Sequence, residues 1–240
     1  MNATIADWLA EGPFTLTLSA GFFGFYAHAG FVAALHEAGL RPARLSGASA
    51  GALVAGLVAS GRTGPELRDR FLAVRRADFW DPKPGLGLLR GDRFRQILDD
   101  FLGHATFEAC PTPVAVTAFD LLARRPRVLD SGLLAPAIQA SCAFPGLLQP
   151  VRVHGRLHLD GALSDRPGLL GVPPGERVLY HHLPSSRRRF GVGQDHPRRP
   201  SLVAIEHDGL PQVHPFALDR GGEAFTVALR ETRRALARPK

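Results

Sequence analysis

The stretch that decides the fold is RLSGASAGALV, residues 44–54. Its centre is G-x-S-x-G, with Ser49 between Gly47 and Gly51. Apolar residues precede the motif, and a run of small, helix-compatible residues follows it to position 60. Strand, tight turn and helix in that order are typical of a nucleophile elbow, where the two glycines remove side chains that would collide. A serine at such a helix N-terminus lies where free N–H groups favour developing negative charge. We therefore predict Ser49 as a nucleophile.

The segments on either side of this motif indicate the fold class. Residues 14–19 alternate apolar and hydroxyl side chains and predict a strand, and residues 26–38 have apolar positions at helical spacing. Residues 43–46 form the next short strand and 50–60 the next helix. A chain that alternates in this way forms a parallel sheet with helices packed on it. We expect an α/β protein, a three-layer α/β/α fold with a mainly parallel central sheet.

The remaining sequence extends this pattern within one domain, residues 1–240. We predict further helices at 65–75, 92–102, 133–142 and 218–238, strands at 113–119, 127–129, 177–182 and 202–206, a hairpin at 151–159, and loops at 79–91 and 184–200. If the site has a mobile cover, it is one of these two loops.

Composition narrows the classes of partner. Lysine and arginine number 29 against 22 acidic residues, a net charge of +7, with no basic helix interleaved with aromatics, so we expect no nucleic-acid partner. The two cysteines, Cys110 and Cys142, have no metal-ligand spacing, so we expect free thiols, no metal and no cofactor. Residues 1–12 include two acidic residues and do not resemble a signal peptide. We expect a cytoplasmic protein without a transmembrane segment.

A serine nucleophile also needs an oxyanion hole and a base. Gly21, Phe22, Phe23 and Gly24 follow the first predicted strand, and their backbone N–H groups are candidates for the oxyanion hole. Asp160 follows a strand-like run and precedes a glycine, so it is a candidate base whose pKa partial burial would raise.

Four blocks together give the sequence a family resemblance. They are LSAGFFGFY (18–26), GASAG (47–51), QASCAFPG (139–146) and DGA (160–162), and the aspartate follows Ser49 by 111 residues. In order and spacing they resemble the glycine-rich loop, nucleophile elbow, A-S-x-A-x-P block and D-G-[AG] motif of the patatin-like phospholipases. The resemblance covers about residues 14–165, and the C-terminal part is assigned by pattern only.

The resemblance implies a lipid acyl hydrolase that acts on a phospholipid or a neutral glycerolipid. Ser49 would attack the ester and form an acyl-enzyme, and Asp160 would take the serine proton without a histidine. Backbone N–H groups around Gly21, Phe22 and Phe23 would stabilise the oxyanion. The partners implied are the lipid substrate and, transiently, a membrane or lipid-droplet surface.

This sequence departs from the usual G-G-G-x-[KR]-G loop of that family. Ser19 and Ala20 stand in place of the first two glycines, and Phe23 stands in place of the basic residue. The missing basic residue favours neutral lipid over phosphate-bearing head groups. Phe25 and Tyr26, which follow, are candidates to line the entrance for the acyl chain.

Three other functions fit the same residues. An α/β-hydrolase esterase would need a histidine after Asp160, and His181, His182, His196, His207 and His214 all satisfy that order. An acyltransferase would pass the acyl group to an alcohol instead of water. A scaffold without catalysis would use the arginines of 184–200 and 218–238 to bind an anionic membrane or a partner.

Overall fold

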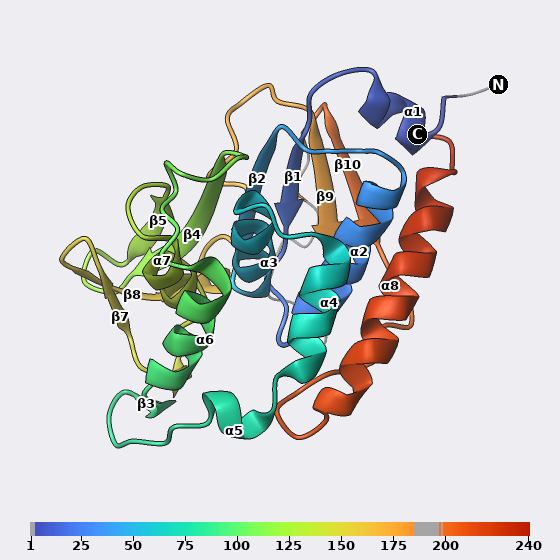
Figure 1. The fold of residues 1–240 in the computed structure, drawn as a ribbon. Helices are drawn as coiled ribbons and strands as arrows, with labels where there is room; N and C mark the ends of the chain where they lie inside the picture. The colour runs from blue at the N-terminus through green and yellow to red at the C-terminus, as the bar shows by residue number, and fades with distance from the viewer. Residues whose placement is uncertain (1–2, 185–196, 198) are drawn as a thin grey trace.

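A computed structural model of the chain describes residues 3–184, 197 and 199–240. Within these residues an eight-stranded sheet has the order β10-β9-β1-β2-β4-β8-β7, with β5 also paired to β4 (Figure 1). Its strands are β1 (Thr15–Leu18), β2 (Arg44–Ala48), β4 (Val114–Asp120), β5 (Arg125–Leu129), β7 (Val151–Val153), β8 (Arg156–Asp160), β9 (Val178–His182) and β10 (Leu202–Glu206). The pairs from β10 to β4 are parallel, and β5, β8 and β7 are antiparallel additions.

Helices flank this sheet, which confirms the predicted α/β class with a mainly parallel centre. They are α1 (Ile5–Ala10), α2 (Phe25–Glu37), α3 (Ala50–Ala59), α4 (Gly64–Ala73), α5 (Arg76–Phe79), α6 (Asp92–Leu102), α7 (Leu134–Ser141) and α8 (Gly221–Leu236), with 3-10 turns at Gly161–Leu163 and Leu218–Arg220. Local sequence fixes several ends. Thr63 caps α4 with a capping box to Glu66, and Gly103 ends α6 in the left-handed conformation.

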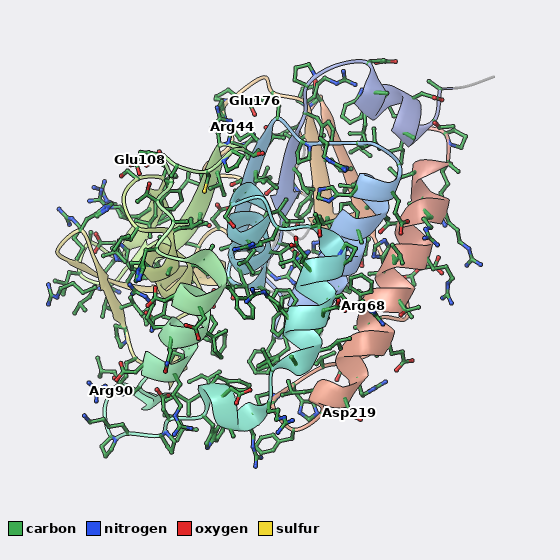
Figure 2. The ribbon with its side chains drawn as sticks, viewed as in Figure 1. Arg44, Arg68, Arg90, Glu108, Glu176 and Asp219 are labelled. Atoms are coloured by element: carbon green, nitrogen blue, oxygen red, sulfur yellow. The ribbon has the colours of Figure 1, made fainter. Side chains whose placement is uncertain are left out.

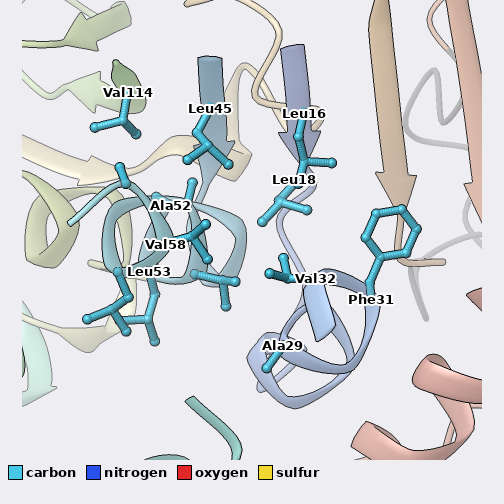
Figure 3. Packing of buried hydrophobic residues seen from close by; sticks show 14 of the residues in the cluster. Leu16, Leu18, Ala29, Phe31, Val32, Leu45, Ala52, Leu53, Val58 and Val114 are labelled. Atoms are coloured by element: carbon cyan, nitrogen blue, oxygen red, sulfur yellow. The ribbon is translucent and has the colours of Figure 1, made fainter. Parts of the chain in front are cut away.

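The main core lies between the sheet and the helices α2 and α3 (Figure 3). Leu16, Leu18 and Leu45 point from β1 and β2 toward Val32 of α2 and Ala52 of α3. All ten residues of α3 are buried, because the sheet and neighbouring helices surround it. A helix of this kind has apolar residues on every side and no amphipathic pattern.

The opposite face of β1 and β2 is covered by the segment 165–172. The Thr17 hydroxyl donates to the carbonyl of Pro167 at 2.8 Å, and the Ser46 hydroxyl donates to that of Gly168 at 2.5 Å. Alternation along each strand therefore separates leucines facing the helices from hydroxyls that bind the backbone of this segment.

One predicted loop is wrong in part. Within 79–91 the structure has a strand, β3 (Gly87–Leu89), paired in parallel with β6 (Gly146–Leu148). A strand of three residues among glycines and prolines gives no periodic signal, and its partner is distant in sequence. A Cβ at Gly87 would lie 2.4 Å from the backbone of Leu148, so glycine permits the pairing. The predicted loop 184–200 lies mostly outside the described residues.

Glycine at position 30 lets α2 and α8 approach closely. A Cβ on Gly30 would lie 2.2 Å from the carbonyl oxygen of Phe225, a backbone atom that cannot move aside alone. Gly222, near the start of α8, has room: its Cβ would meet only Leu72, at 3.6 Å.

We therefore expect Gly30→Ala to lower the free energy of unfolding by about 1–3 kcal/mol, because the helices must separate. Gly222→Ala is the matched control and is expected to raise it by roughly 0.5–1 kcal/mol, through helix propensity. Thermal unfolding of the two variants measures both effects. Equal melting temperatures for Gly30→Ala and wild type would contradict the close contact.

Candidate active site

Ser49 occupies a strained turn between β2 and α3. Its backbone has φ 52° and ψ −120°, a conformation that a residue other than glycine rarely adopts. A Cβ on Gly51 would lie 2.0 Å from the carbonyl oxygen of Leu18, and one on Gly47 would lie 2.5 Å from the backbone of Gly51. Both glycines of the motif are therefore required by backbone contact, as the elbow interpretation predicts.

β4 brings Ser49 and Asp160 together. One edge of β4 pairs first with β2, where Ala48 lies opposite Thr117, and then with β8, where Asp160 lies opposite Ala118. Because β2 is parallel and β8 antiparallel to β4, these two strands run toward each other along the same edge. Their ends meet, and the Ser49 hydroxyl donates a hydrogen bond of 2.8 Å to Oδ2 of Asp160.

The surroundings of Asp160 raise its proton affinity. Only 1% of its surface is exposed, and this burial raises the pKa of its carboxyl to about 6, although hydrogen bonds from Ala162 and Ser49 oppose the shift. The N–H of Ala162 donates to Oδ1 at 2.8 Å and fixes the orientation of the carboxylate. The intervening Gly161 has no room for a side chain, since its Cβ would lie 2.3 Å from the carbonyl oxygen of Thr117.

Ser141, at the end of α7, is a supporting residue that sequence reasoning did not single out. Its hydroxyl accepts from the N–H of Ser49 at 2.8 Å and donates to the carbonyl of Thr117 at 2.6 Å. The next residue, Cys142, directs its thiol to the carbonyl of Ser49 at 3.3 Å. The block 139–146 was the available signal, but only the folded chain shows that it holds the elbow.

The loop after β1 places three N–H groups near the nucleophile. Gly24 differs from the prediction, because its N–H donates to the carbonyl of Gly21 at 2.9 Å and closes the turn. Phe23 has a positive φ of 53° in this turn. No acceptor among the described residues pairs with the N–H groups of Gly21, Phe22 or Phe23. These three remain as candidates for an oxyanion hole.

An apolar cavity of about 200 Å³ opens at this site. Ser49 and Asp160 lie in its wall with Phe22 and Phe25, and aromatic residues from α4, α5 and α6 contribute to the lining: Phe71, Phe79, Phe94 and Phe101. Tyr26 is wrong as a lining residue. It is 1% exposed, and its hydroxyl donates to the carbonyl of Phe71 within the core at 3.1 Å.

The family model of the patatin-like phospholipases matches residues 16–171, more than half of the chain. The chain belongs to the patatin-like phospholipase family.

An uncharacterised NTE family protein of Mycobacterium tuberculosis is 35% identical over 153 residues, which are 62% of this chain and 42% of that protein. Neuropathy target esterase of Drosophila grimshawi is 26% identical over 180 residues, 68% of this chain and 12% of that one. The chain thus spans less than half the length of these curated relatives.

Solved structures agree with the family at the level of the fold. VipD from Legionella pneumophila superposes with a TM-score of 0.67 at 15% identity, covering 93% of this chain and 66% of that one. The type III effector protein ExoU gives a TM-score of 0.52 at 16% identity, covering 93% and 52%.

The histidines considered as alternative bases have other environments. Of those predicted as alternative bases, His181, His182 and His207 are buried, His214 is exposed, and His196 lies outside the described residues. In the part of the chain that the structure covers, no histidine side chain bonds to Ser49 or Asp160. The same part contains no group of three metal-ligating side chains, and none of its helices is long and apolar enough to span a bilayer.

The raised pKa of Asp160 generates a pH prediction for this patatin-like site. The carboxyl accepts the serine proton only when ionised, so hydrolysis should halve near pH 6 and fall about tenfold per unit below it. The measurement is kcat/KM for a soluble ester between pH 4.5 and 8.5. Asp160→Asn is the control, because its residual rate should lack this acid limb. A wild-type profile that is flat down to pH 4.5 would contradict the assignment.

Proposed function

We propose that this chain is a serine-dependent lipid acyl hydrolase that cleaves a carboxylic ester of a glycerolipid through Ser49 and Asp160. The observation that carries the proposal is the hydrogen bond of 2.8 Å between the Ser49 hydroxyl and the carboxylate of Asp160, inside an apolar cavity. The cavity suits an acyl chain, and the family membership supports an ester of a lipid. The Phe23 side chain, in place of a basic residue, favours a neutral head group.

In the first step, Ser49 Oγ attacks the ester carbonyl and its proton passes to Asp160. The carbonyl oxygen becomes an oxyanion, which the N–H groups of Gly21, Phe22 and Phe23 would stabilise. The C–O bond to the alcohol then breaks, and the proton on Asp160 moves to the leaving oxygen. This leaves an acyl-enzyme on Ser49.

In the second step, water attacks the acyl-enzyme and loses a proton to Asp160. The tetrahedral intermediate collapses, the fatty acid leaves, and the proton returns to Ser49 Oγ. A carboxylate with a pKa of about 6 suits both directions of transfer, since it is ionised near neutrality yet basic enough to accept a proton.

A fluorescent alkyl fluorophosphonate tests the nucleophile. We expect wild type to be labelled, Ser49→Ala to lose labelling and at least about 10⁴-fold in turnover, and Asp160→Asn to lose about 10²–10⁴-fold in turnover, because an amide cannot accept the proton. Ser141→Ala is a useful comparison, since it removes a supporting hydroxyl and not the nucleophile. Full activity in a well-folded Ser49→Ala would overturn the mechanism.

We further propose that the cavity opens toward a lipid surface. Five exposed apolar residues lie on segments that contribute to its wall, and we call them the mouth rim: Phe22 (59% exposed), Leu86 (73%), Leu88 (50%), Phe144 (38%) and Phe216 (68%). Several have neighbours in the cavity wall, such as Leu89 beside Leu88 and Pro215 beside Phe216.

β3, α5 and the start of α8 lie together at one end of the molecule, beyond the ends of β1 and β2 (Figure 1). Charges of both signs lie at this end, as Arg90 and Asp219 illustrate (Figure 2). Apolar contact, more than net charge, would therefore hold this face on a membrane or lipid droplet.

Two leucines of equal exposure provide a matched test. Leu88 belongs to the mouth rim, whereas Leu170, 49% exposed, lies on the segment that covers the other face of the sheet. Leu88→Asp should reduce binding to phosphatidylcholine vesicles by about tenfold or more, because a leucine that would be buried in the lipid surface is replaced by a charged residue. Hydrolysis of esters in the vesicles should fall by the same factor. Leu170→Asp should change neither, and both variants should hydrolyse a short soluble ester at the wild-type rate. Equal vesicle binding by the two variants would contradict this orientation.

A further inference from the structure

A row of buried histidines lies behind the candidate oxyanion loop, and the proposed mechanism does not use it. Nε2 of His28 lies 2.8 Å from the carbonyl oxygen of Ser19, and its Nδ1 lies 2.8 Å from Nδ1 of His181. Nε2 of His181 lies 3.2 Å from Nδ1 of His207, whose Nε2 lies 3.1 Å from the hydroxyl of Thr232. The row joins the end of β1, α2, β9, the end of β10 and α8.

The end of the row at Ser19 fixes every tautomer. A carbonyl oxygen only accepts, so Nε2 of His28 carries the proton and Nδ1 of the neutral ring accepts. His181 must then donate from Nδ1 and accept at Nε2, and His207 must donate from Nδ1. The Thr232 hydroxyl lies 3.1 Å from the remaining nitrogen of His207, Nε2, and 2.7 Å from the carbonyl oxygen of Ala228, to which it donates. Each ring is thereby oriented in one direction along the row.

The row stays neutral at physiological pH. Burial lowers the pKa of His28 to about 3 and that of His207 to about 4, and it holds that of His181 well below the ordinary value. Phe31, labelled in Figure 3, stacks on the His181 ring at 4.0 Å and adds to the apolar surroundings. Protonation of His28 at Nδ1, or of His181 at Nε2, would place two N–H groups face to face, so the arrangement requires these two imidazoles to be neutral.

Ser19 is the anchor from which the loop begins. Its N–H donates to the carbonyl of His181 at 3.2 Å, and its hydroxyl accepts from the N–H of Leu183 at 2.9 Å. The next N–H, of Ala20, donates to the carbonyl of Arg166 at 2.8 Å. With its carbonyl bound to His28, every polar atom of Ser19 is engaged.

The bond between His28 and Ser19 spans the loop. The N–H of Gly24 donates to Gly21, and the N–H of His28 donates to the carbonyl of Gly24 at 3.1 Å, so the loop leads directly into α2. The His28 ring then reaches back nine residues to the carbonyl before the loop. The three free N–H groups thus belong to a segment whose two ends, Ser19 and His28, are joined by one hydrogen bond of the imidazole.

We propose that His28 is the positioning residue of the oxyanion loop: by tying Ser19 to α2 it holds the N–H groups of Gly21, Phe22 and Phe23 where the oxyanion forms, and the row behind it fixes its tautomer. This inference rests on the proposed hydrolase function. Positioning of this kind acts on the transition state and leaves substrate binding unchanged.

Two variants of similar size and polarity distinguish the hydrogen bond of His28 to Ser19 from its contact with His181. His28→Gln carries an amide N–H at the distance of Nε2 and can still donate to Ser19. His28→Asn carries a polar atom only at the place of Nδ1 and can face His181 but not Ser19. On a soluble p-nitrophenyl ester we expect His28→Asn to lower kcat about 10- to 100-fold with KM within about twofold, and His28→Gln to recover most of the loss.

The affinity for a transition-state analogue distinguishes a positioning role of His28 from a purely structural one. An alkyl trifluoromethyl ketone adds to a serine hydroxyl and leaves an oxyanion, so its affinity for His28→Asn should fall in the same proportion as kcat. Rates are taken per active site titrated with fluorophosphonate, which removes any loss through misfolding. Equal kcat and equal ketone affinity in the two variants would overturn the inference.

Failure of the proposed function gives a different result. If wild type is neither labelled nor active, the hydrolase proposal fails, and hydrogen–deuterium exchange of residues 19–27 still tests the loop. Faster exchange in His28→Asn than in His28→Gln supports the bridge to Ser19, and equal protection in both overturns it.

Discussion

The end-to-end meeting of β2 and β8 along one edge of β4 is the constraint on which the site depends. A parallel strand and an antiparallel strand share that edge, and their last residues lie opposite Thr117 and Ala118. Ser49 and Asp160, 111 residues apart in sequence, become neighbours without any long side chain reaching between them. Backbone pairing sets the distance between the two groups, and a shift of either strand by one residue would separate them.

Close backbone contact around this junction leaves no room for ordinary side chains. Gly51 faces the end of β1, and Gly161 faces Thr117, in each case too close for a Cβ. The Ser141 hydroxyl hydrogen-bonds to the backbone of Ser49 and to that of Thr117 in β4. The strained backbone of Ser49 is therefore held by these contacts, which is how a conformation unfavourable in itself persists in a folded protein.

The departures from the family's glycine-rich loop have a structural counterpart. Ser19 stands where a glycine is usual, and its hydroxyl accepts a bond from Leu183 that a glycine could not. The Leu183 side chain in turn packs where a Cβ on Gly21 or Gly24 would clash, at 2.7 Å and 2.3 Å. This chain thus anchors its loop with Leu183, which follows β9, and with His28 of α2, and Phe23 adds to the apolar wall of the cavity where the family usually has a charge.

The sequence by itself determined the α/β fold, the glycine-flanked turn at Ser49 and the order of most elements, and it made Asp160 a candidate partner for Ser49. Strand alternation, helical spacing and the glycines needed at close approaches are local properties, readable from a few neighbouring residues. Only the tertiary structure decided that Tyr26 is buried, that the N–H of Gly24 closes a turn, and that β3 pairs with β6. It alone showed that His28, His181 and His207 are in contact. Contacts between residues far apart in sequence depend on how the elements pack, and the residues next to each histidine in the chain do not determine that packing.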